Sequence, residues 1–366
     1  MKKYILLFLF ILISCKNTDY AADIYDMCDS SYLYTSMVLG NDGDSIYFAG
    51  VVDAFLRSES ELIVIEANRQ QVTEVDLSSL RLQIIGQHGL GPHEYNTPVV
   101  GCIMNDGAAI AIADNSKILI YQNNSVRKAI PVENMFAPMD IIQYTDSTIL
   151  AKIIQIKARD GEIIGITTVQ HLGGMFDEEV LWSYSEMVID VTSLNDFINL
   201  VYYGPMFTVD SEYNIYITER DSRHYEIAKL DRYGNYSEIV SNYFSPVQKS
   251  DIQIQDEKYV METFANAIEV TGPPITWIPK SEFNLISGID LGPDGNIWAR
   301  RGYSTQLTYD IFNTDGLYIR TIVLAEDYDC TFWTVHINQY GLVAYDLRPE
   351  LSDQVYIIKY REDISK

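Results

Sequence analysis

The sequence predicts an all-β fold, a six-bladed β-propeller built from four-stranded antiparallel blades. Two observations support this prediction. Short alternating strands joined by Asp-Gly and Asn-x-x-Gly turns recur along the 366 residues, which is typical of antiparallel hairpins. Strand-forming residues also dominate the composition, including 27 tyrosines. Length alone would suggest two or three domains, but the recurrence indicates one repeated unit.

The chain begins with the features of a bacterial lipoprotein signal peptide. Two lysines precede an uninterrupted apolar run over residues 4–13, which is too short to cross a ~30 Å hydrocarbon layer as a helix. The run ends in Leu12-Ile-Ser-Cys15, which resembles the lipobox, where the cysteine is acylated. We therefore expect residues 1–15 to be the signal peptide, with Cys15 as the lipidation site. The polar, acidic residues 16–31 would form a tether.

The residue after Cys15 indicates which membrane would hold the lipoprotein. Lys16 stands where enteric lipoproteins retained in the inner membrane carry Asp, so the outer membrane is favoured. We expect an exported protein that contacts the membrane through its lipid only, with the periplasmic or surface side left open. An ordinary secretory signal with a chance cysteine is the alternative. The net charge of −25 argues against nucleic acid as a partner.

One stretch of the sequence shows the repeated unit clearly. Two strands flank the turn Gly292-Pro-Asp-Gly295, a third follows at 307–312, and the turn Asn313-Thr-Asp-Gly316 leads into a fourth at 317–323. Four such strands make one propeller blade. Similar second strands are centred near residues 64, 110, 150, 216, 297 and 343.

Two of these intervals are longer than one blade and indicate insertions near 170–204 and 241–284. Within the second insertion, the segment Asp251 to Ala267 has the composition of a helix. A seven-bladed ring with one blade hidden in an insertion is the alternative to six blades.

Ring closure is expected to use the beginning of the folded domain, which spans residues 32–366. The sixth unit has no evident fourth strand before the chain ends. Residues 32–39 (YLYTSMVL) can supply it, which would remove an open sheet edge.

The segment Gly86-Gln-His-Gly-Leu-Gly-Pro-His-Glu-Tyr95 lies between the first and second units. It resembles the Gly-x-x-Gly-x-Gly-Pro-Gly-Glu-aromatic signature of six-bladed propeller lipoproteins of Bacteroidetes with NHL-like blades. His93 replaces the usual glycine. The resemblance implies fold and envelope location but little chemistry, and we expect the glycines to serve a tight connection between blades.

One group of residues is a candidate ligand site. Because blade strands alternate in direction, the loops after second strands and the links between blades open on one face. The candidates on this face are Asn68, Arg69, His88, His93, Glu94, Arg220, Arg300, Arg301 and Arg348. Arginines here could form an electropositive mouth for carboxylates. Local ion pairing with adjacent acids is the alternative.

No metal or cofactor is expected. His88, His93 and Glu94 would need a further ligand from another blade to hold a metal, and surface histidines are the simpler interpretation. The remaining cysteines (Cys28, Cys102 and Cys330) have no metal-ligand spacing, and being three they can form at most one disulfide.

No catalytic motif is present, so a binding role is favoured over an enzymatic one. We expect a cell-envelope lipoprotein whose propeller face binds a ligand or a protein partner, such as an anionic glycan or peptide. The alternative is a propeller enzyme, a hydrolase, lyase or lactonase acting on carbohydrate or peptide.

Overall fold

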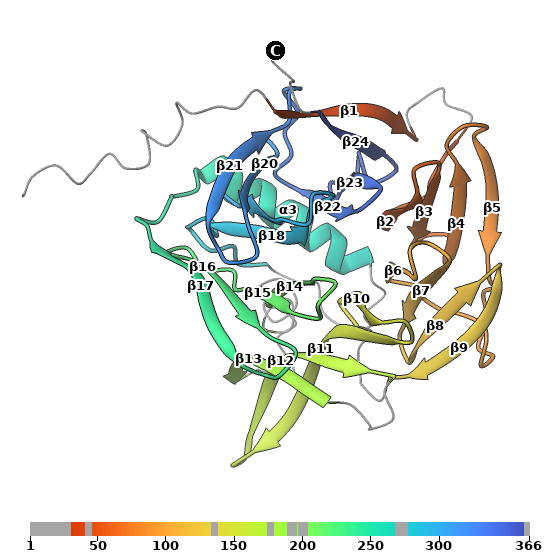
Figure 1. Ribbon diagram of the computed structural model, residues 1–366, viewed down its shortest axis with the longest axis horizontal. Coiled ribbons are helices and arrows are strands. Elements are labelled where there is room, and N and C mark those ends of the chain that lie inside the picture. The colour runs from red at the N-terminus through yellow and green to blue at the C-terminus, as the bar shows by residue number, and fades with distance from the viewer. Residues whose placement is uncertain are drawn as a thin grey trace, which may run out of the picture.

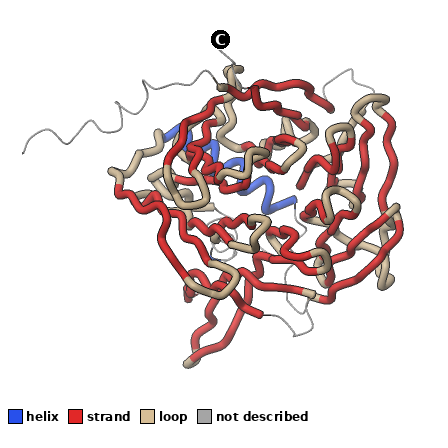
Figure 2. Tube along the Cα trace, in the orientation of Figure 1, coloured by secondary structure: helices blue, strands red, loops and turns tan. Residues whose placement is uncertain are grey.

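The computed structural model confirms a six-bladed β-propeller, with six four-stranded antiparallel sheets arranged in a ring (Figure 1). It describes residues 31–40, 46–132, 138–173, 179–188, 196, 204–267 and 277–361. Cys15, Cys28 and nearly all of the proposed tether therefore lie outside the described residues. Figure 2 shows that strands dominate and that one long helix crosses the ring.

Five blades follow one another directly along the chain. The first contains β2 (Val51–Ser58), β3 (Glu61–Glu66), β4 (Gln71–Asp76) and β5 (Arg81–Ile85). The second contains β6 (Val100–Met104), β7 (Ala109–Asp114), β8 (Lys117–Gln122) and β9 (Ser125–Pro131). The third contains β10 (Asp140–Thr145), β11 (Thr148–Arg159), β12 (Glu162–Leu172) and β13 (Glu179–Val188). The fourth contains β14 (Met206–Val209), β15 (Ile215–Thr218), β16 (His224–Leu230) and β17 (Tyr236–Tyr243). The fifth contains β18 (Ile286–Leu291), β19 (Ile297–Arg301), β20 (Thr308–Phe312) and β21 (Tyr318–Val323).

The sixth blade closes the ring with the first strand of the domain, as predicted. It is formed by β22 (Trp333–Asn338), β23 (Gly341–Asp346), β24 (Val355–Arg361) and β1 (Tyr32–Leu39). Leu33 of β1 lies opposite Tyr360 and is fully buried. The amide of Ala325, after the fifth blade, donates to the Leu33 carbonyl at 2.8 Å. The closing strand is therefore bonded to its own blade and to the neighbouring one.

The two predicted insertions differ in outcome. The helix α3 (Asp251–Ala267) has the bounds expected from composition. The range 170–204, by contrast, contains the end of β12 and all of β13, the outer strand of the third blade. The interval is long partly because β11 and β12 form a hairpin of 12 and 11 residues, longer than the hairpins of the other blades.

Aspartate side chains hold two of the turns between strands of the fourth blade. Oδ1 of Asp210 accepts hydrogen bonds from the amides of Glu212 and Asn214 at 2.8 and 2.9 Å. Asp231 accepts from Tyr233 and Asn235 in the same manner. The side chain thus satisfies the turn amides that the hairpin leaves unpaired.

The core lies between blades, where β-branched and aromatic side chains of adjacent sheets interdigitate. Trp277, Trp298 and Trp333 are all buried there or under α3. Cys102 and Cys330 are buried free thiols, so they form no disulfide with each other. Within the described part of the chain, no helix is long and apolar enough to cross a membrane.

Candidate functional site

The first strands of the six blades surround the propeller axis. Each first strand contacts the first strand of the next blade, and β22 contacts β2 to complete the circle. Polar residues interrupt four of these mostly apolar strands and interact with one another. We call this group the axial cluster: Asp53, Asp140, Asp290 and His336, with Lys152 from a second strand.

Asp53 is the structural centre of the axial cluster. Its carboxylate is 1% exposed, and Oδ1 lies 2.6 Å from Nε2 of His336. Oδ2 accepts a 2.6 Å hydrogen bond from the amide of Gly101. One carboxylate therefore joins the sixth, first and second blades at the axis.

The charge of His336 depends on this contact. Burial alone would lower the pKa of its imidazole, but the charge and hydrogen bond of Asp53, with the charges of Asp290 and Asp140, raise the pKa to about 9. His336 is therefore a cation at neutral pH and a poor general base.

Asp140 and Lys152 form a second, neighbouring pair. They are directly opposite on β10 and β11. Burial raises the pKa of Asp140, while Lys152 and His336 oppose the rise. Burial also lowers the pKa of Lys152 to about 8; Asp140 opposes this, and the charge of Arg220 adds to it. Arg220 therefore lies close enough to influence the axial cluster.

A cavity of about 170 Å³ opens beside the axial cluster, under α3 and between the loops of the last three blades. Helix α3 lies on the side of the ring that contains β18 and β22 (Figure 1). Asp290 contributes to the cavity wall from β18, and Arg220 comes from the loop after β15. Burial raises the pKa of Asp290 to about 7; His336 opposes this rise and Asp140 adds to it.

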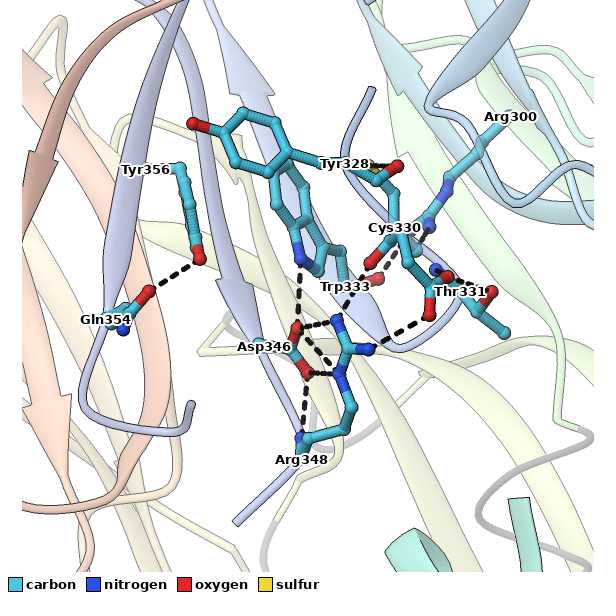
Figure 3. A network of polar contacts seen from close by, with 10 residues as sticks. Arg300, Tyr328, Cys330, Thr331, Trp333, Asp346, Arg348, Gln354 and Tyr356 are labelled. Carbon is cyan, nitrogen blue, oxygen red and sulfur yellow. Dashed lines mark hydrogen bonds and ion pairs between the residues drawn. The ribbon is translucent and has the colours of Figure 1, made fainter. Parts of the chain in front are cut away.

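Two predicted arginines reach the same cavity but bond to the protein. Arg300 and Arg301 belong to the end of β19 and not to the loop after it. Arg300 donates to the carbonyls of Trp333 and Cys330 at 2.5 and 2.6 Å, as seen in Figure 3. Arg301 forms an ion pair with Asp310 at 2.6 Å. The charge of Arg301 is therefore balanced by a carboxylate, whereas the two acceptors of Arg300 are neutral carbonyls.

The cavity also has a cation and an anion from the α3 region. Lys249, just before the helix, is paired with Glu257 on the helix, and both side chains are nearly buried. Trp277 packs beneath the helix and donates from Nε1 to Glu257 at 3.3 Å. These contacts fix α3 over the cavity.

The other predicted site residues lie outside the cavity lining, and two of them form local ion pairs. Arg69 contacts Glu66 at 2.9 Å and the carbonyl of Tyr47. Arg348 contacts the fully buried carboxylate of Asp346 at 2.5 Å (Figure 3). It also forms an ion pair with Asp329. Asn68, near Arg69, is exposed. Arg69 and Arg348 therefore form local ion pairs with nearby acids, which is the alternative to an electropositive mouth.

The Gly86–Tyr95 segment connects two blades. Gly86 has φ +72°, and a Cβ there would lie 2.5 Å from the Tyr121 hydroxyl. A Cβ at Gly89 would lie 2.1 Å from the carboxylate of Glu94, which accepts a hydrogen bond from the amide of Gly91. The glycines at these positions therefore provide space and a backbone angle that larger residues lack.

The two histidines of this segment are exposed. The side chains of His88 and His93 are at the surface, and among the described residues no group of three or more potential metal ligands occurs.

Sequence reasoning did not identify the axial cluster. The available signal was a charged residue inside the first strand of a unit, as in Val51-Val-Asp53 and Ile289-Asp290. Since first strands converge on the axis of a propeller, such residues from different blades meet although they are far apart in sequence.

No protein-family model matches the chain, and no curated protein matches its sequence. Several solved structures are similar to the chain over most of its length. A putative exported protein from Bacteroides fragilis has 12% identity and a TM-score of 0.48, over 91% of this chain and 96% of that one. Regucalcin, a calcium-binding protein from Agrobacterium tumefaciens, has 10% identity and a TM-score of 0.45, over 88% and 94%. Virginiamycin B lyase from Staphylococcus aureus has 10% identity and a TM-score of 0.45, over 90% and 99%.

These similarities carry no conclusion about chemistry. The resemblance of the Gly86–Tyr95 segment to envelope lipoproteins stays a prediction, because none of these matches tests it.

Proposed function

We propose that this chain is an exported, lipid-anchored protein of the cell envelope that binds an anionic ligand, a glycan or peptide, in the cavity under α3. Its role is recognition and not catalysis. Cys15 is the proposed anchor, and the outer membrane is the proposed location.

The observation that carries this proposal is the charge of the cavity lining. Its cations are Arg220, Lys249, Arg300 and Arg301, and its acids are Glu257 and Asp290. The cations outnumber the acids by four to two in a chain whose net charge is −25. Arginine side chains in a partly dehydrated cavity favour carboxylate ligands.

The size of the cavity limits the ligand. A cavity of about 150 Å³ holds a benzene molecule, and this one measures about 170 Å³. It therefore accepts a group of about the size of a benzene ring, and the rest of a longer ligand would extend out of the cavity.

The binding experiment uses a chain beginning at residue 31 on an array of acidic glycans and acidic peptides. Arg220→Gln should weaken binding of any hit about tenfold, since it removes a charged donor from the cavity. Arg232→Gln is the matched control, because Arg232 is exposed in the turn between β16 and β17, at the opposite face. Unchanged binding by Arg220→Gln, or no hit on the array, would contradict the proposal.

The anchor has its own test. The full chain expressed in a bacterial host should incorporate an alkyne-labelled fatty acid and partition into the detergent phase. Cys15→Ser should abolish both properties. Label retained in the variant would exclude Cys15 as the lipid site.

A further inference from the structure

Asp290 is an acid of the cavity wall for which the described residues supply no side-chain partner. It is half-buried, lies on the cavity wall, and its carboxylate accepts a hydrogen bond from the backbone amide of Ile337. Among the described residues, no side chain forms an ion pair or hydrogen bond with it. The neighbouring cations bond elsewhere: His336 to Asp53, and Arg300 to two carbonyls.

Such an arrangement is costly for the free protein. A partly buried carboxylate with one backbone hydrogen bond and no bonded cation is less well stabilised in its charged form than it would be in water. A second carboxylate, Asp140, lies near enough to add to the repulsion. A positively charged group of a ligand bound in the cavity would supply the missing partner of the Asp290 carboxylate.

The cavity wall contains a cation, Arg220, and an anion, Asp290, so a matching ligand has one group of each charge. Arg220 comes from the fourth blade, whereas Asp290 comes from the fifth. A ligand that carries both a carboxylate and an ammonium group can satisfy both.

We propose that the cavity recognises the zwitterionic part of an amino acid, or a peptide end that presents both charges, with the ammonium group on Asp290 and the carboxylate toward Arg220. This inference rests on the proposed function and narrows its ligand class to amino acids and peptides rather than glycans.

The competing arrangement is a protonated Asp290 that donates to a ligand carboxylate. The charged and titratable groups that face Asp290 are His336 from β22, Arg300 and Tyr309 from its own blade, Asp140 from the third blade, and Arg220 at the cavity wall. An ammonium ligand favours the ionised carboxyl and releases a proton below the pKa of about 7. A lone carboxylate ligand favours the neutral carboxyl and takes a proton up.

Calorimetry separates these cases. The probes are the twenty L-amino acids, and each one that binds is compared with the acid that has the same skeleton but no amino group. At about pH 6.5, in two buffers of different ionisation enthalpy, we expect at least one amino acid to bind with proton release. Its deaminated analogue should bind at least about tenfold more weakly.

Variants then assign the two charges. Asp290→Asn should weaken amino-acid binding about tenfold and change binding of the deaminated analogue less than about threefold, whereas Arg220→Gln should weaken both. Asp290→Asn should fold, since it removes a poorly compensated buried charge. Asp256→Asn, at an exposed position on α3, is the matched control.

The outcomes distinguish this inference from the proposed function. Equal binding of the deaminated analogue, proton uptake, or no binding by any amino acid would overturn the zwitterion inference while leaving an anion site intact. Ligands that bind regardless of Arg220→Gln would overturn the proposed function itself.

Discussion

Removing the charge of Asp53 should destabilise the ring by an amount that depends on pH. The ordinary pKa of a histidine is 6.5, and that of His336 in the folded protein is about 9. At 1.36 kcal/mol per pH unit, the difference corresponds to about 3 kcal/mol of stability. Because the folded-state pKa is the higher one, this contribution is fully present below pH 6.5 and is lost as the pH rises through about 9.

The test is urea unfolding of Asp53→Asn, which keeps an acceptor for the Gly101 amide but removes the negative charge. Tryptophan fluorescence should report a loss that is larger at about pH 6 than at about pH 10, by up to about 3 kcal/mol, since Asp53 is the first of the three carboxylates that raise this pKa. Asp146→Asn, at an exposed position, should change the free energy of unfolding by less than about 0.5 kcal/mol. An equal loss at both pH values would refute the assignment of this stability to the His336 charge.

Three further predictions concern closure, the buried carboxylate and the thiols. A chain beginning at residue 40 lacks β1 and should melt at a lower temperature and aggregate, by circular dichroism and size-exclusion chromatography, compared with a chain beginning at residue 31; equal melting would contradict the closing role of β1. Asp346→Ala should cost about 3–5 kcal/mol in urea unfolding, because it leaves Arg348 and the Trp333 Nε1 donor without their buried acceptor. Asp329→Ala, which removes the more exposed partner of Arg348, should cost less than about 1 kcal/mol, and similar losses for the two variants would argue against the burial effect. Burial raises the pKa of Cys330 to about 11 and also raises that of Cys102, so neither thiol of the chain beginning at residue 31 should react with Ellman's reagent before denaturation; rapid reaction of the native protein would contradict their burial.

The fold could be predicted because its signals are local. Turn residues and strand alternation define each unit, and the missing fourth strand of the last unit requires a strand from elsewhere. The third blade was harder, since its 12-residue β11 departs from the usual strand length.

The candidate site could be predicted only in part, because it depends on contacts between distant residues. The sequence placed Arg220 and Arg300 on one face, and both line the cavity. It could not show that Arg300 bonds to Trp333 and Cys330, about thirty residues away. Nor could it show that Asp53 meets His336 at the far end of the chain, since that contact exists only after the ring closes.

A crystal structure of the complex with the tightest ligand from the array would show whether the cavity under α3 is the ligand site. We expect ligand density between Arg220 and Asp290, with a carboxylate of the ligand within hydrogen-bond distance of the Arg220 guanidinium. Density elsewhere on the propeller, with this cavity unchanged, would contradict it.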